Sequence, residues 1–274
     1  MQSTETNLDF ANIQGVVLDM DGVTWNGAQI LPGVPDFFLF LREQHIPYVL
    51  ATNNSSKNVD EYVARLSSLG VPAEATNIVT SGTVTAEALA QQYPSRTPIY
   101  VIGSESLIQL LTSFGYEIDP VQAKVIVVGL DTTLTYEKLR IAGQRILAGA
   151  DFIGTNGDLT LPTADGLVPG NGTTLAALQA MTGCAPRLMG KPEPIMYEVA
   201  LKRLGTTASH TLMVGDRLDT DILGAQRSGL QTALVLTGVS TRKDVSALPP
   251  KDLPNGLFEN LAALHDAWQK SVTY

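Results

Sequence analysis

Two aspartates stand two residues apart where an apolar run ends near the start of the chain, in Leu18-Asp19-Met20-Asp21-Gly22. Because side chains alternate along a strand, both carboxylates can face the same side as the strand runs out. Two close carboxylates repel unless a cation or a proton lies between them. Gly22 lets the backbone turn sharply or approach a ligand closely. A pair of solvated turn aspartates is the alternative interpretation.

Five small polar residues, Thr52-Asn53-Asn54-Ser55-Ser56, follow a second apolar run and precede a helix opened by Asn58. Their hydroxyls and amides, together with the free N–H groups at a helix start, suit an oxyanion. Ordinary helix capping explains one or two of the five residues. Thr52, Asn53 and Asn54 are therefore candidates for binding an anionic substrate.

Two further segments carry charged residues at comparable places. Gly190-Lys191-Pro192 lies just before a helix, so Lys191 stands at the mouth of that helix, although an exposed surface lysine is the alternative. An apolar run ending at Val214 continues as Gly215-Asp216-Arg217-Leu218-Asp219-Thr220-Asp221. Asp216, immediately beyond that strand, is the natural metal ligand, and Asp221 is better placed to orient its neighbours. A hard divalent cation needs such oxygens, and a phosphoryl group needs such donors.

These segments must be positioned by an alternation of short β-branched runs with longer amphipathic runs. The expected strands are Gln14–Leu18, Tyr48–Ala51, Ile99–Ile102, Lys124–Leu130, Phe152–Thr155, Thr211–Val214 and Thr232–Leu236. The expected helices are Val34–Gln44, Asn58–Gly70, Val84–Gln92, Ser106–Phe114, Tyr136–Ala148, Thr173–Met181, Ile195–Leu204, Asp219–Arg227 and Asn260–Lys270. This order predicts an α/β fold, a doubly wound and mostly parallel sheet covered by helices. Ligands bind beyond the carboxyl ends of such strands, where the four segments lie.

With these four segments in this order, the sequence resembles the haloacid dehalogenase-like phosphatase superfamily. The wording Thr52-Asn53-Asn54-Ser55 resembles its NagD-like branch, which includes 4-nitrophenylphosphatases, phosphoglycolate phosphatases and pyridoxal-phosphate phosphatases. The branch carries a large α/β cap between its second and third motifs. The resemblance covers residues from about Gln14 to about Val239. It implies a core of residues 1–81 and 178–274 with a cap of residues 82–177 that selects the substrate.

The resemblance also implies a mechanism. Asp19 would attack phosphorus as the nucleophile and form an aspartyl-phosphate, while Asp21 would protonate the leaving alcohol and later activate water. Mg²⁺ would bind Asp19, the main-chain carbonyl of Asp21, and Asp216. The remaining phosphate oxygens would be held by Lys191, Gly22, Thr52, Asn53 and Asn54, and Lys191 would also screen Asp19 from the incoming phosphate. Asp221 would support Lys191 or metal-bound water.

Several positions have open roles. Asp158 lies in the cap region, where it is expected either to contact a substrate hydroxyl or to cap its own loop. Trp25 either walls the pocket or packs. Leu161 replaces the histidine of vertebrate pyridoxal-phosphate phosphatases, which weakens that substrate assignment. Cys184 is expected to be buried. Since such caps mediate dimers in relatives, the resemblance also implies a homodimer through the cap.

Composition limits the partners. Lys and Arg number 18 against 27 Asp and Glu, giving a net charge of −9, which disfavours nucleic acid and an anionic membrane surface. One cysteine allows no internal disulfide, and the polar first twelve residues lack the layout of a signal peptide, so a cytoplasmic protein is expected. The predicted substrate is a small phosphorylated metabolite. A phosphotransferase and a non-catalytic phospho-acceptor or binding module remain alternatives. A dinucleotide-dependent dehydrogenase is disfavoured, since no Gly-x-Gly-x-x-Gly follows an early strand.

Overall fold

The computed structural model describes residues 6–163 and 166–272, which divide into two compact units. Unit 1 comprises Met1–Thr52, Tyr62–Val79 and Lys191–Tyr274, and unit 2 comprises Asn53–Glu61 and Thr80–Gly190. Within the described ranges, no helix is both long and apolar enough to cross a membrane. The predicted cap, residues 82–177, stays a prediction. A compact unit is defined by its internal contacts, whereas a cap is defined by its role in binding substrate.

Unit 1 is built on a six-stranded sheet with the order β15-β14-β13-β1-β4-β5. Its strands are β1 (Gly15–Leu18), β4 (Tyr48–Thr52), β5 (Ile78–Thr80), β13 (Thr211–Gly215), β14 (Gln231–Val235) and β15 (Gly256–Phe258). The pairs β1–β13, β1–β4, β13–β14 and β14–β15 are parallel. Parallel pairing brings the carboxyl ends of β1, β4 and β13 to one edge of the sheet, directly before three of the predicted site segments.

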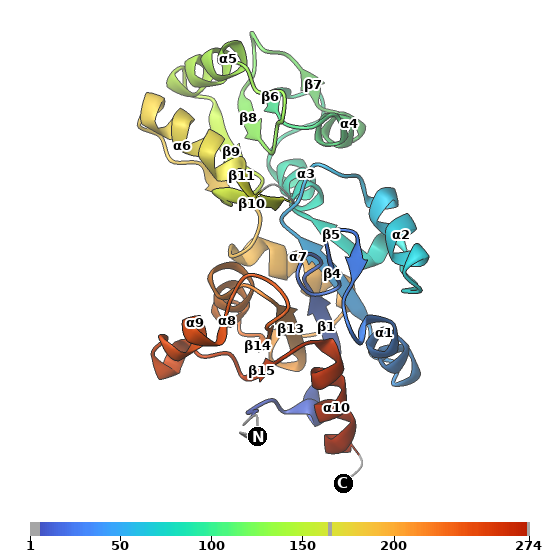
Figure 1. Cartoon of the computed structure of the whole chain (residues 1–274). Coiled ribbons are helices and arrows are strands. Elements are labelled where there is room, and N and C mark those ends of the chain that lie inside the picture. Colours follow the sequence, from blue (N-terminus) through green and yellow to red (C-terminus); the bar gives the residue numbers. More distant parts are fainter. Residues whose placement is uncertain (1–5, 164–165, 273–274) are drawn as a thin grey trace. The chain divides into compact units, whose positions relative to one another are not determined.

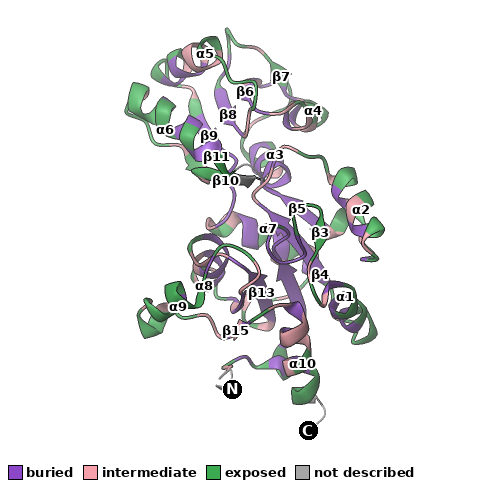
Figure 2. Cartoon of the chain, in the orientation of Figure 1, coloured by how far each residue is buried: buried purple, intermediate pink, exposed green. Residues whose placement is uncertain are grey.

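Burial shows that both faces of this sheet are covered. Every residue of β1, β4 and β13 is buried, as the purple strands of Figure 2 show. Because successive strand residues point to opposite faces, continuous burial requires cover on both sides. The doubly wound α/β core predicted from the sequence is confirmed.

Helices supply this cover. The longer helices of unit 1 are α1 (Val34–Glu43), α7 (Pro194–Leu204) and α10 (Leu261–Val272), and the shorter ones are α8 (Leu223–Arg227) and α9 (Arg242–Ser246). Helix α7 packs on β1 and β4, and α1 packs on α10 through a group of buried aromatic side chains that includes Phe37 and Trp268. Short 3₁₀ helices span Phe10–Asn12, Ala75–Asn77, Ala208–His210 and Pro250–Asp252. A hairpin of β2 (Trp25–Asn26) and β3 (Gln29–Ile30) follows β1 and precedes α1 in the chain, and Figure 1 draws this segment in blue.

Unit 2 has its own five-stranded sheet, ordered β12-β9-β8-β6-β7. The strands are β6 (Pro98–Ile102), β7 (Glu117–Ile118), β8 (Val125–Val128), β9 (Asp151–Gly154) and β12 (Arg187–Leu188). Its helices are α3 (Ser81–Gln92), α4 (Glu105–Ser113), α5 (Tyr136–Leu147) and α6 (Asn171–Thr182), and a hairpin joins β10 (Thr160–Thr163) to β11 (Gly166–Pro169). Helix α2 (Val59–Ser68) begins in unit 2 and ends in unit 1.

The structure corrects three of the expectations drawn from the sequence. Residues expected to form one helix over Asp219–Arg227 form a π-helix, η4 (Leu218–Ile222), followed by α8. Helix α3 begins at Ser81 because Thr80 caps it, three residues before the expected start. Cys184 is exposed, which corrects the expectation of burial, because it follows Gly183, which ends α6 in a left-handed turn.

Candidate active site

Asp19 and Asp21 lie at the carboxyl end of β1 in different environments. The main-chain N–H of Asp19 donates to the carbonyl of Val214 at 2.9 Å, which extends the β1–β13 ladder past the strand. The Asp19 side chain is buried, whereas Asp21 is exposed and accepts a hydrogen bond from Nε1 of Trp25 at 2.8 Å. Gly22 then turns the chain with a φ of +86°, a left-handed conformation that favours glycine. The two carboxylates of the Asp-x-Asp-Gly segment are thus held differently.

Lys191 is buried rather than exposed, which removes the surface-lysine alternative. Its Nζ lies 2.5 Å from Oδ1 of Asp19 and 2.8 Å from Oδ1 of Asp221, and it donates to the carbonyl of Ala51 at 3.1 Å. Burial alone would lower the pKa of Lys191, but the carboxylates of Asp19 and Asp221 outweigh burial and raise that pKa well above its usual value. Lys191 therefore carries a positive charge in the core of unit 1.

Asp216 and Asp221 follow β13 and are both 1% exposed. Oδ2 of Asp221 accepts the N–H groups of Asp216 and Arg217 at 3.1 Å each, so Asp221 holds the loop that presents Asp216. The π-helix η4 brings Asp221 back toward this loop. Oδ2 of Asp216 accepts the N–H of Val239 at 2.7 Å, while its Oδ1 is buried and has no hydrogen-bond partner among the described residues.

Together, Asp19, Asp216 and Asp221 offer carboxylate oxygens that all lie within 4.8 Å of one another. We call these three residues with Lys191 the carboxylate cluster. Burial raises the pKa of Asp216 to about 7, with the charge of Asp221 acting in the same direction. Burial also raises the pKa of Asp19 well above its usual value, against the lowering effect of Lys191. When all four groups are ionised, the cluster has two more negative than positive charges.

Thr52 belongs to unit 1, where it ends β4 at the same sheet edge as Asp19 and is buried. Asn53 and Asn54 belong to unit 2. There the main-chain oxygen of Asn53 accepts hydrogen bonds from Oγ of Ser81 at 2.6 Å and from Nδ2 of Asn156 at 2.7 Å. The carboxylate cluster is thus brought together within one unit, whereas Asn53 and Asn54 are anchored in the other.

Asp158, for which the sequence left two roles open, makes hydrogen bonds to two asparagines of unit 2. Its Oδ2 accepts from Nδ2 of Asn53 at 3.1 Å, and its own N–H donates to Oδ1 of Asn156 at 3.1 Å. Oδ1 of Asn54 accepts from both the N–H and the hydroxyl of Ser56, at 2.8 and 2.7 Å. Asp158 therefore holds the amide side chain of Asn53 within unit 2.

One segment of the site was not found from the sequence: residues 237–240, just beyond β14. The hydroxyl of Thr237 donates to the carbonyl of Gly22, and the N–H of Ser240 donates to the carbonyl of Asp216 at 3.0 Å. A Cβ added to Gly238 would lie 1.9 Å from Oδ2 of Asp216, so glycine is required for this approach. The signal was available, because these residues follow a parallel strand at the same sheet edge.

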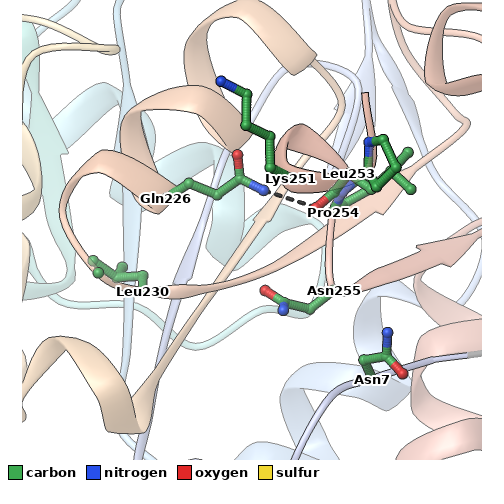
Figure 3. Close-up of a pocket in the computed structure, with 9 residues that line it drawn as sticks. Asn7, Gln226, Leu230, Lys251, Leu253, Pro254 and Asn255 are labelled. Atoms are coloured by element: carbon green, nitrogen blue, oxygen red, sulfur yellow. Dashed lines mark hydrogen bonds between the residues drawn. The ribbon is translucent and has the colours of Figure 1, made fainter. Parts of the chain in front are cut away.

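An open pocket of about 570 Å³ lies elsewhere in unit 1, lined by Asn7, Gln226, Gly229, Leu230, Pro250, Lys251, Leu253, Pro254 and Asn255. Figure 3 shows Gln226 donating to the carbonyl of Leu253, and Oδ1 of Asn255 accepts the N–H of Thr232 at 2.9 Å. None of the predicted site residues lines this pocket, and these two amides already have protein partners. The predicted site residues thus lie apart from this pocket.

The cluster combines buried, hard oxygen ligands with an ammonium group, and the exposed Asp21 lies two residues beyond Asp19 at the end of β1. A buried surplus of carboxylate charge is unstable unless a proton or a cation compensates it. Such an arrangement can bind a divalent cation and present a carboxylate oxygen to an electrophile.

Comparison with known proteins identifies the family. The sequence profile described as haloacid dehalogenase-like hydrolase matches residues 16–117, and a second profile, described as HAD-hydrolase-like, matches residues 188–264. The 5′-nucleotidase YutF of Bacillus subtilis is 39% identical over 85% of this chain and 91% of its own length. The acid sugar phosphatase of Staphylococcus saprophyticus is 37% identical over 87% of this chain and 93% of its own.

Solved structures agree. The 4-nitrophenylphosphatase of Thermotoga maritima matches 95% of this chain and 99% of its own with a TM-score of 0.90 and 34% identity. NagD of E. coli K-12 matches 91% and 97%, with a TM-score of 0.84 and 31% identity. A glycerol phosphate phosphatase of Mycobacterium tuberculosis in complex with magnesium matches 93% and 78%, with a TM-score of 0.86 and 34% identity. The predictions of an enzyme and of a NagD-like fold are confirmed. The chain belongs to the haloacid dehalogenase-like hydrolases, and several of its relatives are named as phosphatases.

Proposed function

We propose that this chain is a Mg²⁺-dependent phosphatase that hydrolyses phosphomonoesters of small metabolites through an aspartyl-phosphate. The observation that carries the proposal is the carboxylate cluster, in which a buried lysine lies 2.5 Å from Asp19 and 2.8 Å from Asp221. Asp216 completes the set of close carboxylates. This combination of groups suits phosphoryl transfer, because the reaction needs a nucleophile and a concentrated positive charge around the phosphoryl oxygens.

The residues present fit a magnesium ion. The donors are carboxylate oxygens, which hard cations prefer, and Oδ1 of Asp216 is buried with no hydrogen-bond partner among the described residues. Asp19 and Asp216 would hold the ion with the main-chain carbonyl of Asp21, and Asp221 would support them. When bound, Mg²⁺ supplies positive charge that neutralises the phosphoryl oxygens and the surplus charge of the cluster.

Asp19 is the proposed nucleophile. Nζ of Lys191 engages its Oδ1 at 2.5 Å, which fixes the orientation of the carboxylate and leaves Oδ2 to attack. In the first step, a bond forms between Asp19 and phosphorus while the ester P–O bond breaks. Lys191 also reduces the repulsion between Asp19 and the incoming phosphate dianion. Burial of Asp19 limits the access of water to the nucleophile before substrate binds.

Asp21 is the proposed general acid and base. In the first step its carboxyl proton passes to the oxygen of the leaving alcohol. In the second step Asp21 takes a proton from water while the water oxygen bonds to phosphorus and the aspartyl P–O bond breaks. The exposure of Asp21 supports this role, because both the leaving alcohol and water must reach it.

Thr52, Gly22, Asn53 and Asn54 are proposed to bind the remaining phosphate oxygens. We further infer that residues 82–177 act as the cap that selects the alcohol part of the substrate. A homodimer through that cap and a cytoplasmic location stay predictions. Because the relatives are named for nucleotides, acid sugar phosphates and 4-nitrophenyl phosphate, a panel of these esters with phosphoglycolate and pyridoxal phosphate would define the substrate.

The decisive experiment measures phosphate release from 4-nitrophenyl phosphate with Mg²⁺, with EDTA, and in the variant Asp19→Asn. We expect turnover with Mg²⁺, loss of turnover in EDTA that added Mg²⁺ restores, and loss of turnover in Asp19→Asn. The matched control is Asp36→Asn, which makes the same change at an exposed residue in the first turn of α1. Activity that survives EDTA or Asp19→Asn would contradict the mechanism.

Further assays on the same purified protein distinguish a phosphatase from a phosphotransferase and from a phospho-acceptor module. A phosphotransferase would yield less free phosphate and a new ester when an alcohol acceptor is added. A phospho-acceptor module would be phosphorylated at Asp19 without turnover, which intact-mass measurement would detect as one retained phosphoryl group. Hydrolysis of many equivalents of ester per chain, unchanged by acceptor, would favour the phosphatase over both.

A further inference from the structure

Trp25 contacts the proposed acid and base directly. We propose that Trp25 is a positioning residue, whose indole N–H selects the conformation of Asp21 and the carboxyl oxygen that carries its proton. This inference rests on the proposed function, because it concerns how Asp21 performs its part. The contact is a hydrogen bond of 2.8 Å from Nε1 of Trp25 to Oδ1 of Asp21.

Trp25 is held in place through both its main chain and its ring. Its N–H donates to the carbonyl of Met20 at 3.3 Å, and its own carbonyl accepts the N–H of Gly22 at 2.7 Å. The side chain is fully buried. Two residues of α2 contact the ring: the Arg65 guanidinium carbon lies 3.9 Å from the ring centroid, and Tyr62 is stacked at 6.5 Å with an interplanar angle of 11°.

Arg65 fixes this hairpin at a second point, because its Nη2 also donates to the carbonyl of Gly27, in the turn between β2 and β3. A guanidinium near an indole face is attracted to the negative face of the ring. Helix α2 therefore holds the hairpin that carries Trp25. The indole N–H is a rigid donor, unlike a surface side chain that would move with its acceptor.

A rigid donor matters here because Asp21 is exposed. An exposed aspartate ordinarily exchanges among side-chain rotamers, and a catalytic group must be held close to its reacting position. A charge-assisted hydrogen bond to a fixed donor favours one rotamer. Of the neighbours in this loop, Trp25 is the one whose side chain donates to Asp21 in the described structure.

The indole also distinguishes the two oxygens of Asp21. An indole nitrogen can only donate, so Oδ1 must accept in both protonation states of the carboxyl group. An oxygen that already accepts the indole N–H is the less favourable place for the proton of the acid form, so we assign that proton to Oδ2, from which it passes to the leaving alcohol oxygen as the ester P–O bond breaks. In the second step Oδ2 takes the proton of the attacking water. Trp25 thus assigns the proton to one oxygen in both steps.

The kinetic experiment compares phenyl phosphate with 4-nitrophenyl phosphate, two esters of similar shape. Phenolate is the more basic leaving group and needs the proton more. We expect Trp25→Phe to lower kcat/KM for phenyl phosphate roughly 10-fold, part of the ~100- to 10,000-fold that a general acid contributes, and 4-nitrophenyl phosphate roughly 3-fold at most. The matched control is Trp268→Phe, which makes the same change at a buried tryptophan of α10 and should leave the ratio of the two esters unchanged.

A double-mutant cycle separates positioning from general damage. If Trp25 acts through Asp21, adding Trp25→Phe to Asp21→Ala should change kcat/KM by about 2-fold or less, because the group being positioned is gone. The same 10-fold loss in both backgrounds, or equal losses for the two esters, would overturn the inference. If the unsubstituted protein releases no phosphate from either ester, the proposed function fails. The hydrogen bond between Trp25 and Asp21 is then tested by the spectroscopic measurement below.

A spectroscopic measurement tests the hydrogen bond without turnover and without relying on the fold of Trp25→Phe. The chain has two tryptophans, so the ¹H–¹⁵N spectrum should contain two indole signals, which Trp268→Phe assigns. We expect the Trp25 indole proton to move upfield in Asp21→Ala, with the Trp268 signal unmoved. Unchanged indole shifts in Asp21→Ala would overturn the inference, whether or not the enzyme is active.

Discussion

Replacing Lys191 with methionine removes the one positive charge of the carboxylate cluster while keeping a chain of similar length. Lys191 is 3% exposed, so solvent cannot easily replace its two ion pairs with Asp19 and Asp221. The substitution leaves three buried carboxylates within 4.8 Å of one another. The prediction is that unit 1 without divalent cations becomes much less stable, and that the loss depends on pH and on Mg²⁺.

The magnitude follows from the geometry. Two unit charges 4.8 Å apart repel by about 3.5 kcal/mol at an effective dielectric constant of about 20. Removing one partner of a buried pair typically costs about 3–5 kcal/mol, because the remaining charge has lost its compensation. We therefore expect Lys191→Met to lower the free energy of unfolding by about 3–5 kcal/mol near pH 8 in EDTA.

The pH dependence has a definite sign. A carboxyl group whose pKa is raised by folding binds protons more readily in the native state, so it lowers stability as pH rises through its folded pKa. Burial raises the pKa of Asp19 and that of Asp216, the latter to about 7, and Lys191 opposes this effect on both. Without Lys191 the native state takes up protons at higher pH. The difference between the two proteins should therefore shrink as pH falls from about 8 to about 6.

Urea unfolding followed by tryptophan fluorescence is the suitable assay, because Trp25 and Trp268 both lie in unit 1 and report on that unit alone. Measurements are made in EDTA and in Mg²⁺ at both pH values. The matched control is Lys202→Met, the same change at an exposed lysine in the last turn of α7. Mg²⁺ should restore part of the stability of Lys191→Met, since a cation bound to the native state stabilises it. A loss below about 1 kcal/mol at pH 8 in EDTA, or one that is independent of pH, would refute the reasoning about surplus charge.

Three other outcomes follow from the structure. Gly238→Ala should abolish the Mg²⁺-induced rise in thermal unfolding temperature, because its Cβ would lie 1.9 Å from Oδ2 of Asp216 and displace that carboxylate; an undiminished rise would contradict this. Tyr197→Phe should cost about 1–3 kcal/mol in urea unfolding, because its buried hydroxyl shares its one proton between two main-chain carbonyls of η4, each 3.0 Å away. Burial opposes ionisation of Asp131, but hydrogen bonds led by Lys138 lower its pKa, so its charge adds stability at neutral pH that is lost as pH falls through the folded pKa. Asp131→Asn should accordingly speed amide exchange in β8 at neutral pH and have less effect in acid.

Much of the fold was predictable because its strands are short, buried on both faces and separated by amphipathic helices. The strands of the core ending at Leu18, Thr52 and Gly215 were predicted to within a residue at their carboxyl ends. Parallel strands with these ends place their following residues together, so the grouping of Asp19 with Asp216 followed from topology. The strand β5 is three residues long and carries too little periodicity to be found in the sequence.

The finer arrangement of the site was not predictable, because it depends on contacts between segments far apart in the chain. The position of residues 237–240 after β14 could have been predicted, but the close approach of Gly238 to Asp216 could not, because it depends on how two different strand ends pack. The π-helix that turns Asp221 toward the loop of Asp216 has the same local sequence character as an α-helix. The hydrogen bonds that Ser81 and Asn156 donate to the main-chain oxygen of Asn53 likewise join segments far apart in the chain.

Net charge is a poor guide to what this protein binds, because the sign of a site is set locally. The chain carries −9, which suggests a poor host for an anionic ligand, and the carboxylate cluster itself is negative. That negative surplus is what attracts a divalent cation, and the cation with Lys191 then reverses the local sign toward phosphate. Replacing the carboxylates with apolar residues would relieve the burial cost and remove the cation site together. The same charges therefore destabilise the metal-free core and provide the binding energy for the cation on which the proposed chemistry depends.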